Sequence, residues 1–405
     1  MYVERHMESV VKKASSMFGS VLVTGPRQVG KTTMLKKVTS GIIYVTMDDT
    51  LILSSALEEG NTFFKDFPPP VFIDEIQRAQ PLFVIMKKII DEKKEKGLFF
   101  LSGSQQFKLM QNVSESLAGR IGILTLLGLS IREMSATPFN IPFVPTDDYF
   151  NERSKTYAPI DNGRLWRLIQ RGCLPELYVD EKMDWRLFYS SYVSSYIKRD
   201  VRELINIEDE LKFTRFMAVL AAHNGAMLNL SSVAGDVGIS VPTAKDWLSV
   251  LRASNIVYLL QPFYNNITGR AIKTPKLYFL DTGLAAYLTR WNTPEVLREG
   301  AMAGAFFESF VISEILKSYY NAGITDPSLY YYRDKEGNEI DLLIEENGFL
   351  HPIEIKKSSD PNKRDIGAFR IVDKLGKRGP GGIICTYDNI LSLDSDNKII
   401  PAGMI

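Results

Sequence analysis

Cysteine and histidine are scarce in this chain. Among its 405 residues there are two cysteines, Cys173 and Cys385, and three histidines. Two cysteines so far apart provide neither a disulfide framework nor a cysteine-rich zinc site. Three scattered histidines are too few for a histidine metal cluster. We therefore expect two ordinary thiols in a reducing compartment.

Long apolar stretches and an excess of one charge are also missing. No stretch approaches the roughly 20 continuous apolar residues of a membrane span. The first 20 residues resemble an amphipathic helix and lack the apolar run and cleavage site of a secretory signal. Lys and Arg total 48, as do Asp and Glu, and this balance neither supports nor excludes a nucleic-acid partner. We expect a cytoplasmic protein with no membrane partner and, at roughly 100–200 residues per domain, several domains.

Short apolar runs alternate with helical patterns in the first third of the chain. Residues 21–23, 42–45, 71–73 and 98–101 form such runs, and residues 81–96 have the apolar spacing of a helix. Strands that are apolar on both faces are typical of a parallel sheet covered by helices on both sides. The predicted fold class is α/β, with a parallel-sheet core over residues 1–145.

A glycine-rich turn follows the first of these strands. Glycines let backbone N–H groups turn toward phosphates, a lysine places a positive charge on the β and γ phosphates, and the next hydroxyl ligates magnesium. Because the turn lies between a strand and a helix, we predict that it binds ATP with Mg²⁺. The residues that match this phosphate-loop motif are Gly25, Pro26, Arg27, Gln28, Val29, Gly30, Lys31, Thr32 and Thr33.

Two adjacent carboxylates end the third apolar strand. Asp74 is expected in the magnesium shell together with Thr32, and Glu75 is placed to polarise the attacking water. Adjacent carboxylates at a strand end can instead form a solvated turn. The phosphate loop upstream, at a spacing typical of this fold, favours the catalytic interpretation.

Five segments carry a family resemblance: GPRQVGKTT at 25–33, FIDEIQ at 72–77, LSGS at 101–104, SLAGR at 116–120 and YIKRDV at 196–201. Together they resemble a group of archaeal and bacterial AAA-type P-loop ATPases whose carboxy-terminal region is conserved but poorly characterised. The resemblance covers nearly the whole chain and implies a P-loop NTPase core, ATP binding and hydrolysis, and no settled substrate. The role of Lys198, Arg199 and Asp200 is unassigned, and we expect a domain-joining helix there.

The last two catalytic candidates come from these segments. In related ATPases a polar residue after the fourth strand senses the γ phosphate, and Ser104 is the first choice here, followed by Ser102; a helix cap is the alternative. Arg120 is the candidate for an arginine that acts on the γ phosphate of a neighbouring subunit, which implies a homo-oligomer. Its alternative is a surface pair with a nearby acid. The predicted catalytic set is Glu75, Lys31, Arg120 and Ser104.

A linker and helical lid are expected over residues 146–207, followed by a winged helix-turn-helix over 208–295. Two helical patterns meet at Gly238, and two strands follow at 256–262 and 276–280. DNA contact by the second helix and the hairpin is one interpretation, and a packing or assembly module is equally open. The basic residues considered for DNA are Lys245 and Arg252 on the second helix, which Asp246 opposes, and Arg270, Lys273 and Lys276 on the hairpin, which are the better candidates.

Residues 300–405 resemble the restriction-endonuclease-like α/β core of PD-(D/E)xK nucleases. Strand alternation places Glu354 and Lys356 on one face of their strand. Asp341 on the adjacent strand and Glu308 on a helix would complete a metal site with Glu354, where Lys356 would activate a water. The alternative is a fold that keeps these residues but serves in DNA binding or assembly.

These patterns predict an ATP-binding and ATP-hydrolysing enzyme of the AAA type. DNA binding or processing through the carboxy-terminal domains is the first hypothesis for its output, with nuclease activity left open. The second hypothesis is a nucleotide-dependent switch or scaffold that binds a protein partner and performs no nucleic-acid chemistry.

Overall fold

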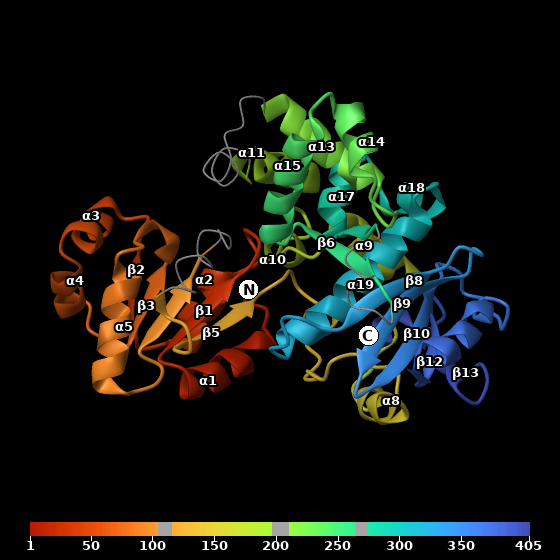
Figure 1. The fold of residues 1–405 in the computed structure, drawn as a ribbon, viewed down its shortest axis with the longest axis horizontal. Coiled ribbons are helices and arrows are strands. Elements are labelled where there is room, and N and C mark those ends of the chain that lie inside the picture. The colour runs from red at the N-terminus through yellow and green to blue at the C-terminus, as the bar shows by residue number, and fades with distance from the viewer. Residues whose placement is uncertain (104–115, 197–209, 265–273) are drawn as a thin grey trace.

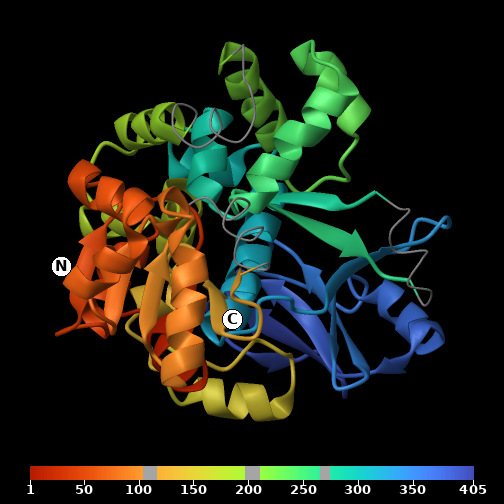
Figure 2. The same cartoon turned by 60° about the vertical axis from the view of Figure 1, so that its left-hand side comes forward.

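The structure, a computed structural model, describes residues 1–103, 116–196, 210–264 and 274–405. The amino-terminal core lies on one side of the molecule and the carboxy-terminal sheet on the other (Figure 1). Helices α13 (Glu210–Ala222), α14 (Leu230–Val237) and α15 (Val241–Ala253) lie at the top of the same view. The long helix α19 (Ala303–Asn321) runs through the centre, in cyan in Figure 2. Within the described residues, no helix combines the length and apolar character needed to cross a membrane.

The core is a parallel sheet in the order β2-β3-β4-β1-β5. Val21 and Val23 of β1 pack with helices α1 and α2 on one face, and Leu22 packs with α3, α4 and α5 on the other. Burial of both faces explains the continuous apolar strands and confirms the predicted α/β class with a parallel core. The elements are α1 Met7–Met17, β1 Ser20–Thr24, α2 Lys31–Val38, β2 Ile43–Thr46, α3 Thr50–Glu58, α4 Gly60–Asp66, β3 Val71–Asp74, η1 Ile76–Arg78, α5 Leu82–Lys93, β4 Phe99–Ser102 and β5 Ile121–Thr125.

The stretch after the core, predicted as a linker and helical lid over residues 146–207, begins with a packed helix. Helix α8 (Asp147–Ser154) lies against the last turn of the chain, η4 (Ala402–Met404). The Tyr149 hydroxyl donates to the Met404 carbonyl oxygen at 2.8 Å, and Arg153 donates to that of Gly403 at 2.9 Å. These contacts attach α8 to the carboxy-terminal end, so residues 147–154 are not a free linker.

The middle of the chain is helical. Helix α14 ends at Gly238, whose φ of 75° is the left-handed conformation that glycine adopts easily. Ser240 then caps α15 by accepting from the Thr243 backbone N–H. The elements are α7 Ile131–Met134, α9 Asn162–Arg171, α10 Pro175–Val179, α11 Trp185–Tyr196, α13 Glu210–Ala222, α14 Leu230–Val237, α15 Val241–Ala253, β6 Val257–Pro262, β7 Lys276–Phe279, α17 Thr282–Leu288 and α18 Pro294–Glu299.

A second sheet runs from the β6–β7 hairpin to the end of the chain. Its order is β13-β14-β12-β10-β9-β8-β6-β7, with β11 beside β10. The parallel pairing of β6 with β8, Gln261 opposite Tyr330, joins the hairpin to the carboxy-terminal strands. The two units predicted at 208–295 and 300–405 therefore share one sheet. The elements are β8 Leu329–Arg333, β9 Glu339–Glu346, β10 Phe349–Ile355, η3 Gly367–Ile371, α20 Val372–Leu375, β11 Lys377–Arg378, β12 Gly381–Cys385, β13 Leu391–Ser392 and β14 Asn397–Pro401.

Candidate nucleotide site and carboxylate cluster

The phosphate-loop residues connect β1 to α2 at the carboxyl edge of the core sheet. Gly25 has a φ of 136°, and a Cβ at this position would lie 2.0 Å from the Leu126 carbonyl oxygen. Gly30, with a φ of 90°, is the N-cap of α2. Only glycine fits both the conformation and the space at residue 25. The loop thus leads into a helix amino terminus, where free N–H groups and the helix dipole favour an anion.

Lys31 and Thr32, near the end of the loop, have different partners. Lys31 is buried, and its ammonium donates to the carbonyl oxygens of Gly25 at 2.9 Å and Pro26 at 2.7 Å. The Thr32 hydroxyl donates to both carboxylate oxygens of Asp74, at 3.2 and 3.0 Å. Lys31 therefore places its charge within the loop, and Thr32 connects the loop to the neighbouring strand end.

Asp74 lies at the end of β3, beside the ends of β4 and β2. Its carboxylate also accepts hydrogen bonds from the Ser102 hydroxyl and, at 3.3 Å, from the Tyr44 hydroxyl. Because carboxyl ends of parallel strands meet at one edge, residues distant in sequence converge here. A carboxylate and a hydroxyl in contact are oxygen ligands of the kind that Mg²⁺ prefers, so Thr32 and Asp74 fit the predicted magnesium role.

Glu75 has an unusual backbone. Its φ of 53° places a non-glycine residue in the left-handed region, which is sparsely populated and is enriched at functional sites. The Gln77 side-chain amide, which is buried, donates to the Glu75 carboxylate. The turn after β3 and this amide thus determine where the predicted water-polarising carboxylate points.

A pocket of about 420 Å³ opens beside the loop. It is lined by the amino-terminal residues Tyr2 and Val3, by Gly30 and Thr33 of the loop and α2, and by Pro175 of α10. The lining is mainly apolar, as is common for pockets that hold flat organic groups.

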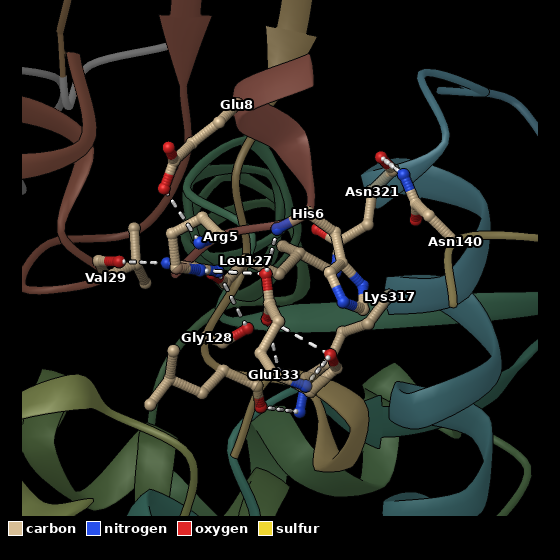
Figure 3. A network of polar contacts seen from close by, with 12 residues as sticks. Arg5, His6, Glu8, Val29, Leu127, Gly128, Glu133, Asn140, Lys317 and Asn321 are labelled. Atoms are coloured by element: carbon tan, nitrogen blue, oxygen red, sulfur yellow. Dashed lines mark hydrogen bonds and ion pairs between the residues drawn. The ribbon is translucent and has the colours of Figure 1, made fainter. Parts of the chain in front are cut away.

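The buried Arg5 joins the amino-terminal segment to the phosphate loop (Figure 3). Its guanidinium donates to the carbonyl oxygens of Val29 at 2.7 Å and Leu127 at 2.8 Å, and to Glu133 Oε1 at 3.0 Å. Burial opposes ionisation of Glu133, but Arg5 and backbone N–H groups lower the pKa of Glu133 below its usual value. This network connects the loop to the segment after β5.

Helix α19 contacts the same segment from the carboxy-terminal side. Glu314 Oε2 accepts from the Ile131 backbone N–H at 2.8 Å, and the Lys317 ammonium donates to the Leu129 carbonyl oxygen at 3.0 Å. Glu314 and Lys317 also pair with each other at 2.7 Å. Residues 127–133 are therefore held by Arg5 on one side and by α19 on the other, as Figure 3 shows for Lys317.

Arg120 lies away from this chain's own phosphate loop. It precedes β5, beside Ser20 at the start of β1, whereas the loop follows the end of β1. Its guanidinium pairs with Asp91 of α5 at 2.6 Å. This position agrees with the alternative that Arg120 forms a surface ion pair. Its action on the γ phosphate of a neighbouring subunit stays a prediction. Ser104, the segment Lys198 to Asp200, and both Arg270 and Lys273 fall outside the described residues.

The four residues predicted for a nuclease-type site do come together. Glu354 of β10 is buried and pairs with Lys356 at 2.6 Å. Asp341 of β9 accepts from the Ile355 backbone N–H at 2.9 Å. Glu308 of α19 lies beside Asp341, because the Lys276 ammonium is 3.1 Å from Glu308 and 3.6 Å from Asp341. Burial first and Asp341 next raise the pKa of Glu308 to about 7. Burial and Asp341 likewise raise the pKa of Glu354 to about 8.

A lysine that was assigned to the hairpin surface lies within this cluster. Lys276, considered above for DNA contact, is buried, and its ammonium lies 3.1 Å from Glu308, 2.7 Å from Glu339 and 3.6 Å from Asp341. In the described part of the chain, no three His, Cys, Asp or Glu residues are arranged to hold a metal ion. The cluster residues therefore do not fit a metal in this conformation, and Lys276 is not exposed to DNA.

The sequence analysis did not predict a site role for Arg5, Tyr44, Gln77 or Glu339. It also did not predict that Lys276 lies within the carboxylate cluster. Gln77 carried a signal, because it lies in the quoted FIDEIQ segment. The others depend on contacts between elements far apart in the chain. Both cysteines are buried, which raises the pKa of Cys173 to about 12 and of Cys385 to about 11, and they take no part in either site.

Comparison with known sequences divides the chain into three matches. Residues 18–135 match the AAA domain, residues 162–295 a domain of unknown function (DUF8612) and residues 303–405 another domain of unknown function (DUF4143). The uncharacterized protein Rv2008c of Mycobacterium tuberculosis is 27% identical over 369 residues, which are 89% of this chain and 76% of that protein. The uncharacterized protein Mb2031c of Mycobacterium bovis matches to the same extent.

Solved structures with some likeness include the Walker-type ATPase PABY2304 of Pyrococcus abyssi. It is 14% identical with a TM-score of 0.45, over 70% of this chain and 94% of that one. AMPPCP-bound DnaA from Aquifex aeolicus is 12% identical with a TM-score of 0.30, over 61% of this chain and 85% of that one. The sequence match over residues 18–135, which contain the phosphate loop, Asp74 and Glu75, shows that this chain carries an AAA-type P-loop ATPase domain.

Proposed function

We propose that the protein binds ATP with Mg²⁺ at the loop of residues 25–33 and hydrolyses it. The observation that carries this proposal is the contact of Thr32 with Asp74 at 3.0 Å, at the edge of the sheet where the loop turns into α2. Mg²⁺ would be held by the Thr32 hydroxyl and by Asp74, and it would neutralise charge on the phosphates. Lys31 would leave the loop carbonyls for the β and γ phosphates.

Glu75 is the proposed group that polarises the attacking water. Its carboxylate follows Asp74 directly, and the Gln77 amide orients it. The mainly apolar pocket between Tyr2, Val3 and Pro175 would take the adenine base, because it opens next to Gly30 and Thr33. In this arrangement the amino-terminal segment contributes to nucleotide binding at its base end, and the loop binds the phosphates.

Two variants test the ATPase proposal. We expect Lys31→Ala to lose ATP binding, measured by titration calorimetry, because the phosphates lose their cation. Glu75→Gln is expected to bind ATP like the wild type and to hydrolyse it very slowly, since its side chain keeps the shape but cannot accept a proton. The exposed Lys88→Ala on α5 serves as the control for a lost lysine. Wild-type turnover by Glu75→Gln would contradict the assignment of Glu75.

The proposed output of the ATPase is a change in the carboxy-terminal units. The contacts of α19 with Ile131 and Leu129 support this coupling, since the same segment binds Arg5 and, through it, the loop. DNA is our first candidate partner, on the strength of the helix-turn-helix formed by α14 and α15, in which Lys245 is exposed. A protein partner is the second, because Asp246 opposes Lys245 and Lys276 is buried.

One experiment distinguishes a DNA partner from a protein partner. ATP hydrolysis is measured with and without single-stranded and double-stranded DNA at low and moderate salt, on material sized by light scattering. Salt-sensitive stimulation supports DNA, because phosphate contacts release counterions. Lys245→Glu should then weaken the stimulation. No binding and no stimulation at low salt would support the switch or scaffold with a protein partner.

A further inference from the structure

The positive charge within the carboxylate cluster is the ammonium group of Lys276. We propose that Lys276 is the permanent counter-ion of Glu308, Glu339 and Asp341, that it holds the β6–β7 hairpin to α19 and β9, and that it excludes a divalent metal ion from the cluster. This conclusion reverses the metal-binding role that the sequence predicted for Glu308 and Asp341. It does not depend on ATP binding.

The Lys276 ammonium lies within hydrogen-bonding distance of two carboxylates, Glu339 and Glu308, and within ion-pair distance of a third, Asp341. An ammonium has three N–H groups, and carboxylate oxygens of Glu339, Glu308 and Asp341 lie 2.7, 3.1 and 3.6 Å from Nζ. Mg²⁺ requires oxygen ligands at about 2.0–2.1 Å in an octahedron. A metal ion bound by these same oxygens would therefore occupy the position of Nζ. The lysine and the metal exclude each other.

The strand that carries Lys276 is attached to α19 along its whole length. The Tyr278 hydroxyl donates to Glu308 at 2.5 Å, the Ser309 hydroxyl to the Phe279 carbonyl oxygen at 2.9 Å, and the Ser313 hydroxyl to that of Leu280 at 2.7 Å. These contacts hold the backbone of β7 against α19, and the Lys276 side chain is buried beside them. Lys276 therefore belongs to the buried contact between β7 and α19 and is not an exposed surface side chain.

Charge supports the same assignment. Glu308, Glu339 and Asp341 belong to α19 and β9, and the Lys276 ammonium lies within ion-pair distance of all three. Arg333 of β8 lies 3.6 Å from Glu339, and Lys356 is paired with Glu354. Buried carboxylates without a counter-charge are strongly destabilising. Loss of Lys276 would therefore lower the free energy of unfolding, whereas loss of a surface lysine would not.

A metal titration of the folded protein tests exclusion directly. Mn²⁺ alone, without nucleotide, is titrated into the full chain carrying Asp74→Asn, which weakens the loop's own metal site, and free Mn²⁺ is followed by electron paramagnetic resonance. We expect no stoichiometric binding at about 1 mM, a concentration that fills even weak carboxylate sites. One bound Mn²⁺ that Asp341→Asn removes would overturn the proposal.

Stability measurements test the counter-ion role. We expect Lys276→Met to lower the unfolding midpoint, while Lys245→Met, an exposed lysine on α15, leaves it unchanged. Adding Glu308→Gln to Lys276→Met should recover part of the loss, because one uncompensated charge is removed. A purely steric role for the lysine predicts no such recovery. A wild-type midpoint for Lys276→Met would also overturn the proposal, and if that variant does not fold, the Mn²⁺ titration decides.

Discussion

Asp74 depends on its neighbours for its position. Its carboxylate accepts from Thr32, Ser102 and Tyr44, which come from α2, β4 and β2. Groups that hydrogen-bond to a metal ligand orient it, and their loss typically lowers metal affinity by about 10- to 100-fold. Ser102 is fully buried, so water cannot replace its hydroxyl easily. Ser102 thus belongs to the proposed magnesium site without being a ligand.

Ser102→Ala tests this role. We expect it to raise the Mg²⁺ concentration that half-saturates ATP hydrolysis by about 10-fold or more. Tyr44→Phe removes a longer hydrogen bond, at 3.3 Å, and should have a smaller effect. Both variants are measured by a Mg²⁺ titration of the hydrolysis rate at saturating ATP. An unchanged Mg²⁺ dependence for Ser102→Ala would exclude the orienting role.

His6 provides a test of pH dependence. Burial lowers the pKa of His6 below its usual 6.5, although Glu133 opposes this, and Arg132 and Arg5 lower it further. Its Nε2 lies 2.8 Å from the Thr137 carbonyl oxygen. On acidification the unfolded chain binds a proton at His6 before the folded chain does. The His6 contribution to the free energy of unfolding therefore falls as the pH drops below about 6.5.

His6→Gln keeps a donor for Thr137 and cannot titrate. We expect the wild type to lose stability relative to this variant between about pH 7.5 and about pH 5.5, and not above that range. Urea unfolding at both pH values measures the difference. An equal difference between wild type and variant at the two pH values would show that His6 titrates normally in the folded protein.

At the scale of elements, residues 127–133 are the segment through which the loop and α19 meet. Arg5 donates to Val29 and Leu127, and Lys317 donates to Leu129. Arg5 is buried and charged, so its removal leaves the Glu133 carboxylate without its cation and the carbonyl oxygens of Val29 and Leu127 without this donor. Breaking a buried ion pair in this way costs about 3–5 kcal/mol.

Arg5→Gln is expected to lower the free energy of unfolding by about 3 kcal/mol or more and to raise the Kd for ATP. The second effect follows because Val29, a loop residue, loses its contact. Arg132→Gln is the matched control, since Arg132 is equally buried but bonds to the carbonyl oxygens of Ile405 and Ile141. If the two variants bind ATP with equal Kd values under conditions where both are folded, Arg5 contributes to stability and not to ATP binding.

The elements differ in how well the sequence predicts them. The apolar strands and the phosphate loop follow from local pattern, because burial of both sheet faces leaves a continuous apolar run. The pairing of β6 with β8 does not, since Gln261 and Tyr330 are brought together only by tertiary packing. Lys276 was assigned to a solvent-facing hairpin for the same reason. The carboxylate cluster was predicted, but the cation inside it depends on that non-local pairing.

At the scale of the whole molecule, the Arg120–Asp91 pair bears on assembly. Arg120 is at the amino edge of the core sheet, with the phosphate loop at the opposite edge, so it cannot serve its own chain's loop without a large rearrangement. It can serve a second copy if that copy presents its loop to this edge. Within one chain, Asp91 neutralises Arg120 and holds it on α5.

Two variants distinguish assembly from a surface pair. If Arg120 acts on a neighbouring subunit, ATP hydrolysis per chain should rise with protein concentration, and Arg120→Ala should lose this rise and most of the activity, since such arginines contribute about 10³- to 10⁵-fold. Asp91→Ala removes the same ion pair but leaves Arg120 free to act, so it should keep the activity. Equal activity of both variants and the wild type at every concentration would reduce the pair to a surface contact, which contributes about 0–1 kcal/mol to stability. Loss of activity in both variants would instead show that the pair itself is required, because Asp91 would then hold Arg120 in its working position.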